Sequence, residues 1–254
     1  LKCSKCGLIF SNPIIEESKI NSLYFKSDFN YNQEAQYLKK TYFNYFKKYL
    51  LNSDSKNIKI LEVGCGNGFF LEELRENGIS NIYGLEPGKS SVEKADKFIR
   101  KRIKINILKI GLYPKRSFDI ICCFHTLDHI VDINTFLKEV NELLRKNGKI
   151  FFVVHNTDGL SVKLFGERSP IFDIEHIYLF NPRSLERIFK KNGFSNLNVF
   201  NVNNTYPLNY WVKLFPMPNL LKKIILKIFD ITKIGLISLT LGAGNIGIVG
   251  KKLN

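Results

Sequence analysis

The middle of the chain alternates short apolar runs with stretches in which apolar residues recur at helical spacing. The apolar runs predict strands over Ile58–Val63, Asn81–Leu85, Ile103–Ile110, Phe118–Phe124 and Ile150–His155. The stretches between them predict helices from the glycines after Val63 to about Asn77, over Ser90–Arg100, and over Ile133–Arg145 with a stop at Asn147-Gly148. Strands that alternate with helices in this way run parallel and are covered on both faces, so the pattern predicts a doubly wound α/β sheet.

The pattern differs on both sides of this core. Ahead of it, aromatic and Leu residues between Gln33 and Leu51 recur at helical spacing and predict an amphipathic helix. After it, the sequence predicts an irregular segment, a helix opened by a proline and two further strands, at residues 156–181, from Pro182, over Phe194–Val202 and over Gly247–Lys252. The glycines of Gly242–Gly247 are expected to form the turn into the last strand, because no βαβ unit follows them.

The predicted strand that ends at Val63 leads directly into three glycines spaced G-x-G-x-G, at Gly64, Gly66 and Gly68. Glycines at this spacing allow a tight turn and let a ligand touch the backbone. Glu86 follows eighteen residues after Gly68, at the end of the next predicted strand. A carboxylate there can accept hydrogen bonds from both hydroxyls of a ribose. Together these features predict a nucleotide-type cofactor site; the alternative is a structural turn beside a surface carboxylate.

These residues resemble the motifs of class I S-adenosylmethionine-dependent methyltransferases. The matching segments are LEVGCGNG, YGLEP, SFDIICCFHTLDHI and LLRKNGKIFFVV. The resemblance implies a Rossmann-like sheet of seven strands, mostly parallel with an antiparallel last strand, and S-adenosylmethionine as the cofactor. It assigns the methionine part of the cofactor to Glu62 and the glycine turn, and the ribose to Glu86. The chain departs from the family at Asn106–Lys109, where many members have an acidic residue that binds adenine.

Histidines are the candidates for chemistry at the acceptor. Methyl transfer needs a base only where the accepting atom must lose a proton. His125 and His155 end predicted strands, at the edge of the sheet where ligands bind. Each is either a satisfied polar group, which is common for a lone histidine at a strand end, or a contact to cofactor or substrate, and His125 is assigned to the cofactor. His129 is expected to pack or cap, next to Asp128, where the family more often has Glu.

A narrower resemblance links the chain to methyltransferases that begin with a Cys knuckle and are associated with glycan modification. Its matching segments are KCSKCGLIFSNP, EHIYLFNPRSLERIFKKNGF and LGAGNIGIVGKK. It implies a sugar or glycan precursor as the acceptor, with His176 as the base and Glu175 orienting it. The alternative is that His176 only bonds a loop to the sheet. The implied organisation is a knuckle with its linker, a methyltransferase domain and two substrate-covering segments, at residues 1–32, 33–254, 156–181 and 203–242.

The five cysteines do not have the pattern of a disulfide framework. Their count is odd, and Cys122 and Cys123 are adjacent within an apolar run, which favours a reducing compartment and a cytoplasmic protein. Cys3 and Cys6 have the spacing of half a zinc knuckle, whereas structural zinc needs four ligands. The resemblance implies a second cysteine pair upstream, so we expect zinc at Cys3 and Cys6 only where such a pair exists.

The formal net charge is +15, from 38 Lys and Arg against 23 Asp and Glu. It reflects either a compositional bias toward Lys or an anionic partner, and its diffuse distribution does not favour nucleic acid. Leu220–Phe229 combines an apolar stripe at helical spacing with Lys222, Lys223 and Lys227. This stretch is expected either to pack in the core or to make peripheral contact with an anionic membrane. The alternatives to glycan methylation are therefore O-methylation of a lipid-like acceptor at a membrane surface, and non-catalytic binding of nucleic acid.

Overall fold

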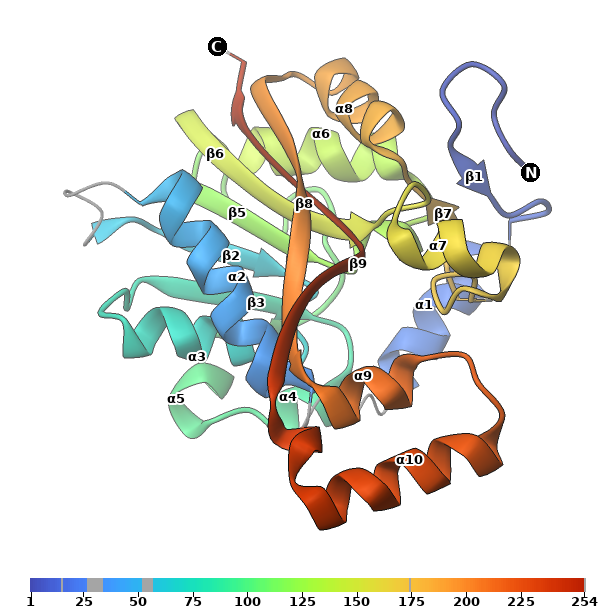
Figure 1. The fold of residues 1–254 in the computed structure, drawn as a ribbon. Helices are drawn as coiled ribbons and strands as arrows, with labels where there is room; N and C mark the ends of the chain where they lie inside the picture. The colour runs from blue at the N-terminus through green and yellow to red at the C-terminus, as the bar shows by residue number, and fades with distance from the viewer. Residues whose placement is uncertain (15, 27–33, 52–56, 174, 254) are drawn as a thin grey trace.

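The computed structural model describes residues 1–14, 16–26, 34–51, 57–173 and 175–253. Its centre is a seven-stranded sheet (Figure 1), with the spatial order β4 (Ile103–Ile105), β3 (Ile82–Glu86), β2 (Ile60–Val63), β5 (Phe118–Phe124), β6 (Leu144–His155), β9 (Ser238–Lys252) and β8 (Phe194–Pro207). Strands β2 to β6 run parallel, whereas β9 is antiparallel to both of its neighbours. The predicted doubly wound sheet of seven strands with an antiparallel last strand is confirmed.

Alternate residues of the central strands face opposite sides of the sheet. In β5, Ile120 and Cys122 pack on one side, and Ile121 and Cys123 pack on the other. The helices that cover the first side are α2 (Glu34–Leu50), α3 (Phe69–Glu76), α4 (Lys89–Glu93) and α5 (Lys97–Arg100), and those that cover the second are α6 (Ile133–Leu143) and α8 (Pro182–Lys191). Apart from the half-buried Asp119, β5 is apolar because both of its faces are buried, which is why the sequence predicts its bounds correctly.

Two element boundaries predicted around β4 are wrong. β4 ends five residues early, because Asn106–Ile110 leaves the sheet and lines a cavity. The helix predicted over Ser90–Arg100 is divided into α4 and α5. The division occurs because the Asp96 carboxylate accepts a hydrogen bond from the N–H of Phe98 at 2.9 Å and caps a new helix.

Two further corrections concern β6 and β9. α6 ends at Leu143, because the next residue already pairs with β5, so the stop predicted at Asn147-Gly148 is wrong. The glycines of Gly242–Gly247 lie inside β9 and not in a turn before it. The ring of Phe200 in β8 occupies the space that a Cβ on Gly247 would need, so glycine here allows two neighbouring strands to pack closely.

The N-terminal residues are joined to the main body by a second, two-stranded sheet. β1 (Ile9–Phe10) pairs antiparallel with β7 (Tyr178–Leu179). The side chain of Asn181 also donates a hydrogen bond to the carbonyl of Cys6 at 3.0 Å. The next element is α1 (Glu17–Lys26). The domain boundary predicted at residue 32 lies outside the described residues.

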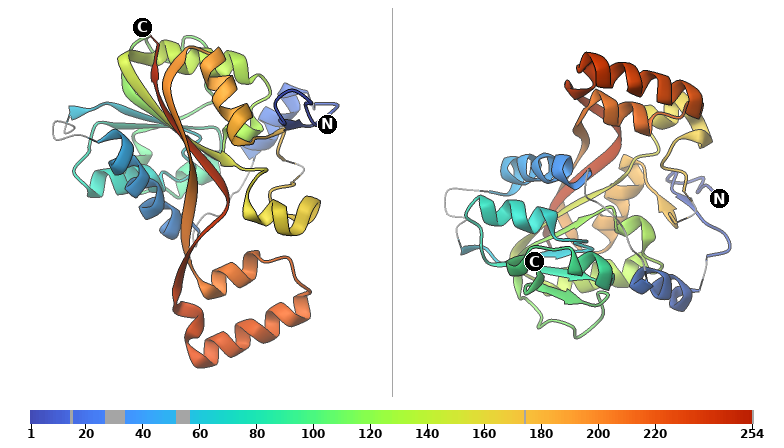
Figure 2. Two further views of the ribbon diagram at one scale, coloured as in Figure 1. Left: turned by 45° about the horizontal axis from the view of Figure 1, so that its top comes forward. Right: turned by 90° about the horizontal axis from the view of Figure 1, so that it is seen from below.

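The segment before β9 projects from the body. β8 and β9 extend beyond the sheet as a long antiparallel ribbon, and three helices lie at its end (Figure 2): α9 (Leu208–Leu214), α10 (Asn219–Thr232) and the short η4 (Ile234–Leu236). Between β6 and β7 lie α7 (Leu160–Phe165) and η3 (Gly166–Arg168). Within the described parts of the chain, no helix is both long and apolar enough to cross a bilayer.

Candidate active site

The glycine turn connects β2 to α3 at the carboxyl edge of the sheet. Gly64, Gly66 and Gly68 have φ angles of 74°, 54° and 75°, a region that residues with a Cβ rarely adopt. A Cβ on Gly64 would also overlap the side chain of Thr126, which follows β5. Gly64 and Gly66 line a cavity, whereas Gly68 precedes α3 and lies against Ile99. Two of the three predicted glycines therefore border the space for a ligand.

Glu86 ends β3, beside the glycine turn. Its carboxylate accepts hydrogen bonds from the N–H of Gly66 at 2.9 Å and from the N–H of Gly88 at 2.8 Å. Burial raises the pKa of Glu86, and these two hydrogen bonds oppose the rise. Each carboxylate oxygen has two lone pairs, so both oxygens retain an acceptor site for ribose hydroxyls.

Glu62 lies in β2 and is only 1% exposed. Its Oε2 atom has no hydrogen-bond partner among the described residues. Burial, and then the nearby charge of Glu86, raise the pKa of Glu62. A buried carboxylate on a cavity wall is complementary to a cationic group such as the ammonium of a methionine moiety. The two carboxylates and the turn therefore fit S-adenosylmethionine, and the predicted assignment, in which Glu86 would hold the ribose and Glu62 the amino-acid part, stays a prediction.

These groups border a cavity of about 660 Å³. Pockets for cofactors and small molecules have volumes of this order. Apolar side chains from distant parts of the chain also line the cavity, namely Ile107, Leu108, Ile110, Phe165, Trp211, Leu214, Phe215 and Pro216. The cavity thus combines polar groups suited to the cofactor with an apolar wall suited to an acceptor.

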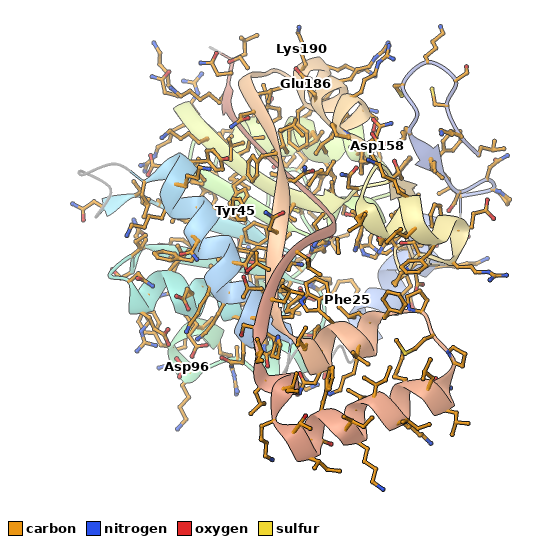
Figure 3. All side chains as sticks on the ribbon, in the orientation of Figure 1. Phe25, Tyr45, Asp96, Asp158, Glu186 and Lys190 are labelled. Atoms are coloured by element: carbon orange, nitrogen blue, oxygen red, sulfur yellow. The ribbon has the colours of Figure 1, made fainter. Side chains whose placement is uncertain are left out.

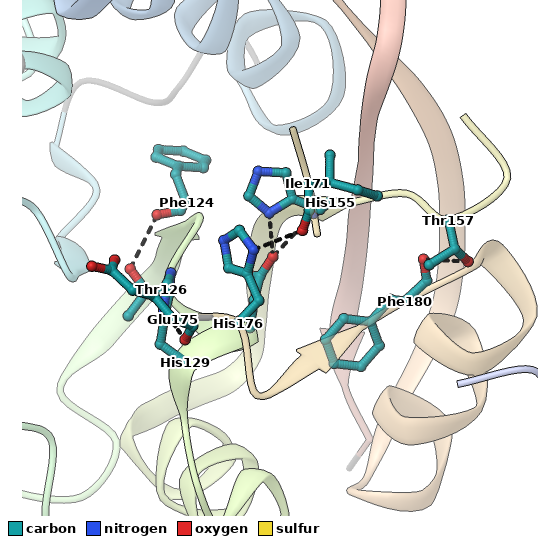
Figure 4. Close-up of polar contacts among 10 residues, drawn as sticks. Phe124, Thr126, His129, His155, Thr157, Ile171, Glu175, His176 and Phe180 are labelled. Atoms are coloured by element: carbon teal, nitrogen blue, oxygen red, sulfur yellow. Dashed lines mark hydrogen bonds and ion pairs between the residues drawn. The ribbon is translucent and has the colours of Figure 1, made fainter. Parts of the chain in front are cut away.

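Four imidazoles lie together on the wall of this cavity, three of which are drawn in Figure 4. His125 follows β5, His129 ends the short helix η2 (Leu127–His129), His155 ends β6, and His176 precedes β7. The distances between ring centres are 4.6 Å for His125 and His155, 4.4 Å for His155 and His176, and 4.9 Å for His129 and His176. Strands and loops far apart in the sequence therefore place all four rings in one cluster.

Hydrogen bonds define the tautomers of three of these rings. The contacts of Nδ1 are His155 to Asp128 Oδ2 at 2.7 Å, His129 to the Glu175 carbonyl at 2.9 Å, and His176 to the Ile171 carbonyl at 2.8 Å. Because these oxygens only accept hydrogen bonds, Nδ1 carries a proton in each of the three rings, and Nε2 of a neutral His129 or His176 keeps a lone pair. Burial lowers the pKa of His129 and of His176, and lowers that of His125 to about 3. His125, His129 and His176 are therefore neutral at pH 7.

Asp128 is the buried partner of His155. Its Oδ2 atom also accepts a hydrogen bond from the backbone N–H of His155 at 3.1 Å. Burial favours a raised pKa for Asp128, but the hydrogen bond and charge of His155 outweigh burial and hold the pKa below its usual value. His125, Asp128 and His155 also bring possible metal-ligating atoms within 4.8 Å of one another. Because His155 already donates two hydrogen bonds to one oxygen of Asp128, we interpret Asp128 and His155 as a hydrogen-bonded pair.

The structure brings most of the residues predicted from the sequence to one cavity. Its lining includes Glu62, Gly64, Gly66, Glu86, His125, His155, Glu175 and His176. The prediction that Glu175 orients His176 differs from the structure. The ring of His176 donates to the Ile171 carbonyl, and the Glu175 carbonyl accepts from the ring of His129. His129, which was expected only to pack or cap, is a member of the cluster. Its position beside Asp128, between two predicted strand ends, was the available signal.

Cys3 and Cys6 lie in a separate turn near the N-terminus. The N–H of Gly7 bonds the carbonyl of Cys3, and the N–H of Cys3 bonds the carbonyl of Leu8. Both thiols are free, and the backbone N–H groups of Cys6 and Lys5 lower the pKa of the Cys3 thiol. Over the residues that the structure describes, no third metal-ligating side chain joins the two cysteines. Zinc binding with a further cysteine pair stays a prediction.

The sheet order, the glycine turn after β2 and the carboxylate at the end of β3 define a class I S-adenosylmethionine-dependent methyltransferase fold. The chain belongs to the methyltransferase-domain family, whose family model matches residues 32–199. Among solved structures, the fold is similar to that of a methyltransferase from Thermotoga maritima described as a possible histamine N-methyltransferase. That structure has a TM-score of 0.58 and 18% identity, covering 87% of this chain and 92% of the other.

Curated relatives include ubiquinone biosynthesis O-methyltransferases. The enzyme of that name from Pelagibacter ubique is 35% identical over 138 residues, which are 52% of this chain and 57% of the relative. The human mitochondrial one is 29% identical over 154 residues, which are 54% of this chain and 42% of the relative. The chain thus spans about half the length of these relatives. Their names do not support the narrower resemblance to glycan-associated methyltransferases with a Cys knuckle.

Proposed function

We propose that this chain transfers a methyl group from S-adenosylmethionine to a hydroxyl of a largely apolar acceptor. The observation that carries the proposal is that one cavity joins the carboxylates and glycine turn, the histidine cluster and an apolar wall. The relatives named above are O-methyltransferases, which supports oxygen as the accepting atom.

The reaction is an in-line displacement, in which the acceptor oxygen bonds to the methyl carbon as the carbon–sulfur bond breaks. Much of the rate acceleration can come from holding the reactants in line. The hydroxyl proton passes to a base, for which His176 is our candidate. The Ile171 carbonyl holds its Nδ1–H at 2.8 Å, so the Nε2 lone pair is available. A proton taken at Nε2 would strengthen that hydrogen bond, because the ring then carries a charge.

The apolar wall favours a lipid-like acceptor over a sugar. Leu214 and Phe215 present carbon atoms, and the Nε1–H of Trp211 is already bonded to the Leu239 carbonyl at 2.9 Å. A sugar packed there would leave hydroxyls without partners, at a cost of about 1–3 kcal/mol for each. The glycan acceptor implied by the sequence resemblance is therefore our second hypothesis.

The test is the release of S-adenosylhomocysteine from the purified chain with three groups of acceptors: phenols with and without apolar tails, nucleotide sugars, and RNA. We expect release with the tailed phenols. Release with nucleotide sugars alone would overturn the apolar acceptor. RNA binding that weakens steeply with salt, without release, would favour the nucleic-acid-binding alternative.

The role of His176 is tested by His176→Asn, which can still donate a hydrogen bond toward Ile171. We expect kcat to fall at least about 100-fold, because a positioned general base contributes at least this much. The affinity for S-adenosylhomocysteine should stay unchanged. In the native enzyme, the rate should be lost as pH falls through the pKa of His176, which burial lowers from 6.5. An unchanged kcat in the variant would assign proton removal to another group.

A further inference from the structure

Residues 208–239 form an arm that comprises α9, α10, η4 and the start of β9. The arm lies at the end of the β8–β9 ribbon, where α10 projects away from the sheet and its covering helices (Figures 1 and 2). α9 connects the arm to the body, because the ring of Tyr210 lies 5.9 Å from that of Tyr37 in α2. α10 contacts mainly α9 and η4, and none of its 14 residues is buried. Most helices in proteins are stabilised by packing of an apolar face, whereas α10 has apolar side chains that the described residues leave exposed.

The two faces of α10 differ in what they contact. Ile225, Leu226 and Phe229 are half-buried, and Phe229 lies against Gly235 of η4. The outward residues are large and apolar, and their exposed fractions are 73% for Leu220, 48% for Leu221, 49% for Ile224, 51% for Ile228 and 73% for Ile231. At 3.6 residues per turn, these five positions fall within an arc of about 100° and form one stripe.

The apolar surface continues from α10 onto the rest of the arm. Its further exposed residues are Leu214, Phe215, Ile234, Leu236, Ile237 and Leu239. The arm therefore carries eleven of the nineteen exposed large apolar side chains found among the described residues. A contiguous apolar surface of this kind marks a contact with a protein or a membrane.

The charge of the arm distinguishes between these occupants. The arm contains five lysines and one acidic residue, which gives a net charge of 5 − 1 = +4, from Lys213, Lys222, Lys223, Lys227, Lys233 and Asp230. The arm of a second copy would bring the same positive charge against it, whereas anionic headgroups attract each lysine. Lys223 and Lys227 are exposed and follow the apolar stripe along one side. This arrangement is typical of a helix that lies in the plane of a membrane surface.

We infer that the arm binds the surface of an anionic lipid bilayer, with α10 parallel to the membrane plane and its apolar stripe in the headgroup region. The arm also reaches the site, because Trp211, Leu214, Phe215 and Pro216 line the cavity. An acceptor with an apolar tail can thus pass from the bilayer along α9 toward the histidines. The inference goes beyond the proposed acceptor, since membrane binding is measured without turnover.

The experiment is co-sedimentation of the full chain with vesicles of phosphatidylcholine alone or with phosphatidylglycerol added as an anionic lipid, because an anionic surface attracts each nearby lysine. In the first variant, Lys223→Glu and Lys227→Glu reverse two charges beside the stripe. Lys222 is left in place because its Nζ donates to the Lys213 carbonyl at 2.8 Å and holds the arm together. Binding to anionic vesicles should fall at least about 25-fold, since each lysine contributes about a factor of five.

The matched control is Lys190→Glu with Lys191→Glu, which makes the same charge change at the end of α8. Figure 3 shows Lys190 at the opposite end of the molecule from α10. A second variant, Ile224→Ser with Ile228→Ser, removes apolar contact and should weaken binding more than about tenfold. Circular dichroism and calorimetry with S-adenosylhomocysteine verify that the variants are folded, because the cofactor end lies outside the arm.

Three results would overturn the inference: no binding of the native chain to anionic vesicles, equal losses in the arm and control variants, or a native dimer that the isoleucine variant dissociates. The last result would show that a second copy covers the arm. Turnover of a soluble phenol without vesicles reports separately on the proposed function. That turnover should be the same in the lysine variant and the native chain. A failure of the proposed function can therefore be distinguished from a failure of the proposed membrane binding.

Discussion

Replacement of Glu86 by Ala tests the position of the ribose. A hydrogen bond to a charged group contributes about 1.5–3 kcal/mol, and the carboxylate can accept one from each of two ribose hydroxyls. Glu86 is partly buried, and burial raises its pKa, so the lower end of that range applies. We therefore expect a loss of about 3 kcal/mol in binding, which corresponds to an increase of about 150-fold in the Kd for S-adenosylhomocysteine.

Isothermal titration calorimetry measures this Kd directly. Glu93→Ala removes the same charge from an exposed position on α4 and should leave the Kd unchanged. Glu86→Gln keeps one acceptor oxygen and should give an intermediate loss. Because Glu86 also holds the N–H groups of Gly66 and Gly88, thermal unfolding must show that the turn remains folded. A folded Glu86→Ala variant with a Kd within about threefold of the native value would refute this position for the ribose.

Two further predictions concern the turn and the histidine cluster. Gly64→Ala should lower the free energy of unfolding by about 2–4 kcal/mol, because the left-handed φ of 74° disfavours a Cβ and the added methyl overlaps Thr126. Thermal unfolding measures the effect, combination with Thr126→Ala should recover part of it, and an unchanged Tm would contradict the argument. His125 has a pKa of about 3 in the folded chain against 6.5 unfolded, so the unfolded chain gains a proton first as pH falls. The contribution of the neutral His125 ring to the free energy of unfolding is then fully present above about pH 6.5. It is lost as pH falls, by about 2 kcal/mol between pH 7 and pH 5. Urea unfolding at both values should show this decrease, His125→Asn should reduce it, and equal stability of the native chain at both would show that burial does not hold the ring neutral.

The fold and the cofactor end of the site could be predicted because their signals are local in the sequence. Gly64 and Gly66 follow an apolar run directly, and a strand–turn–helix unit fixes where they lie. Glu86 ends the next strand, and parallel neighbours bring both ends to one edge of the sheet. No long-range information is needed for these positions.

The acceptor side could not be predicted in the same way, because it is assembled from distant segments. His125 and His155 end neighbouring strands, but the distance of His176 from them depends on the path of the loop after β6. The carbonyl of Ile171, which orients His176, belongs to the backbone and leaves no pattern of side chains to detect. The turn predicted at Gly242–Gly247 was wrong for a related reason. Glycine is required both in many turns and where two strands pack closely, and the sequence does not distinguish the two.

The pairing of β1 with β7 has a practical consequence for anyone who modifies this protein. The strand that follows His176 is held by Ile9 and Phe10, and the N–H of Ser11 bonds the Ile177 carbonyl at 2.9 Å. A purification tag or fluorescent fusion joined near the N-terminal residues would therefore be attached next to the support of His176, the base that we propose. Lys251 pairs with Lys149 near the start of β6, away from the edge that carries the cavity. The C-terminal end is the safer place for a label.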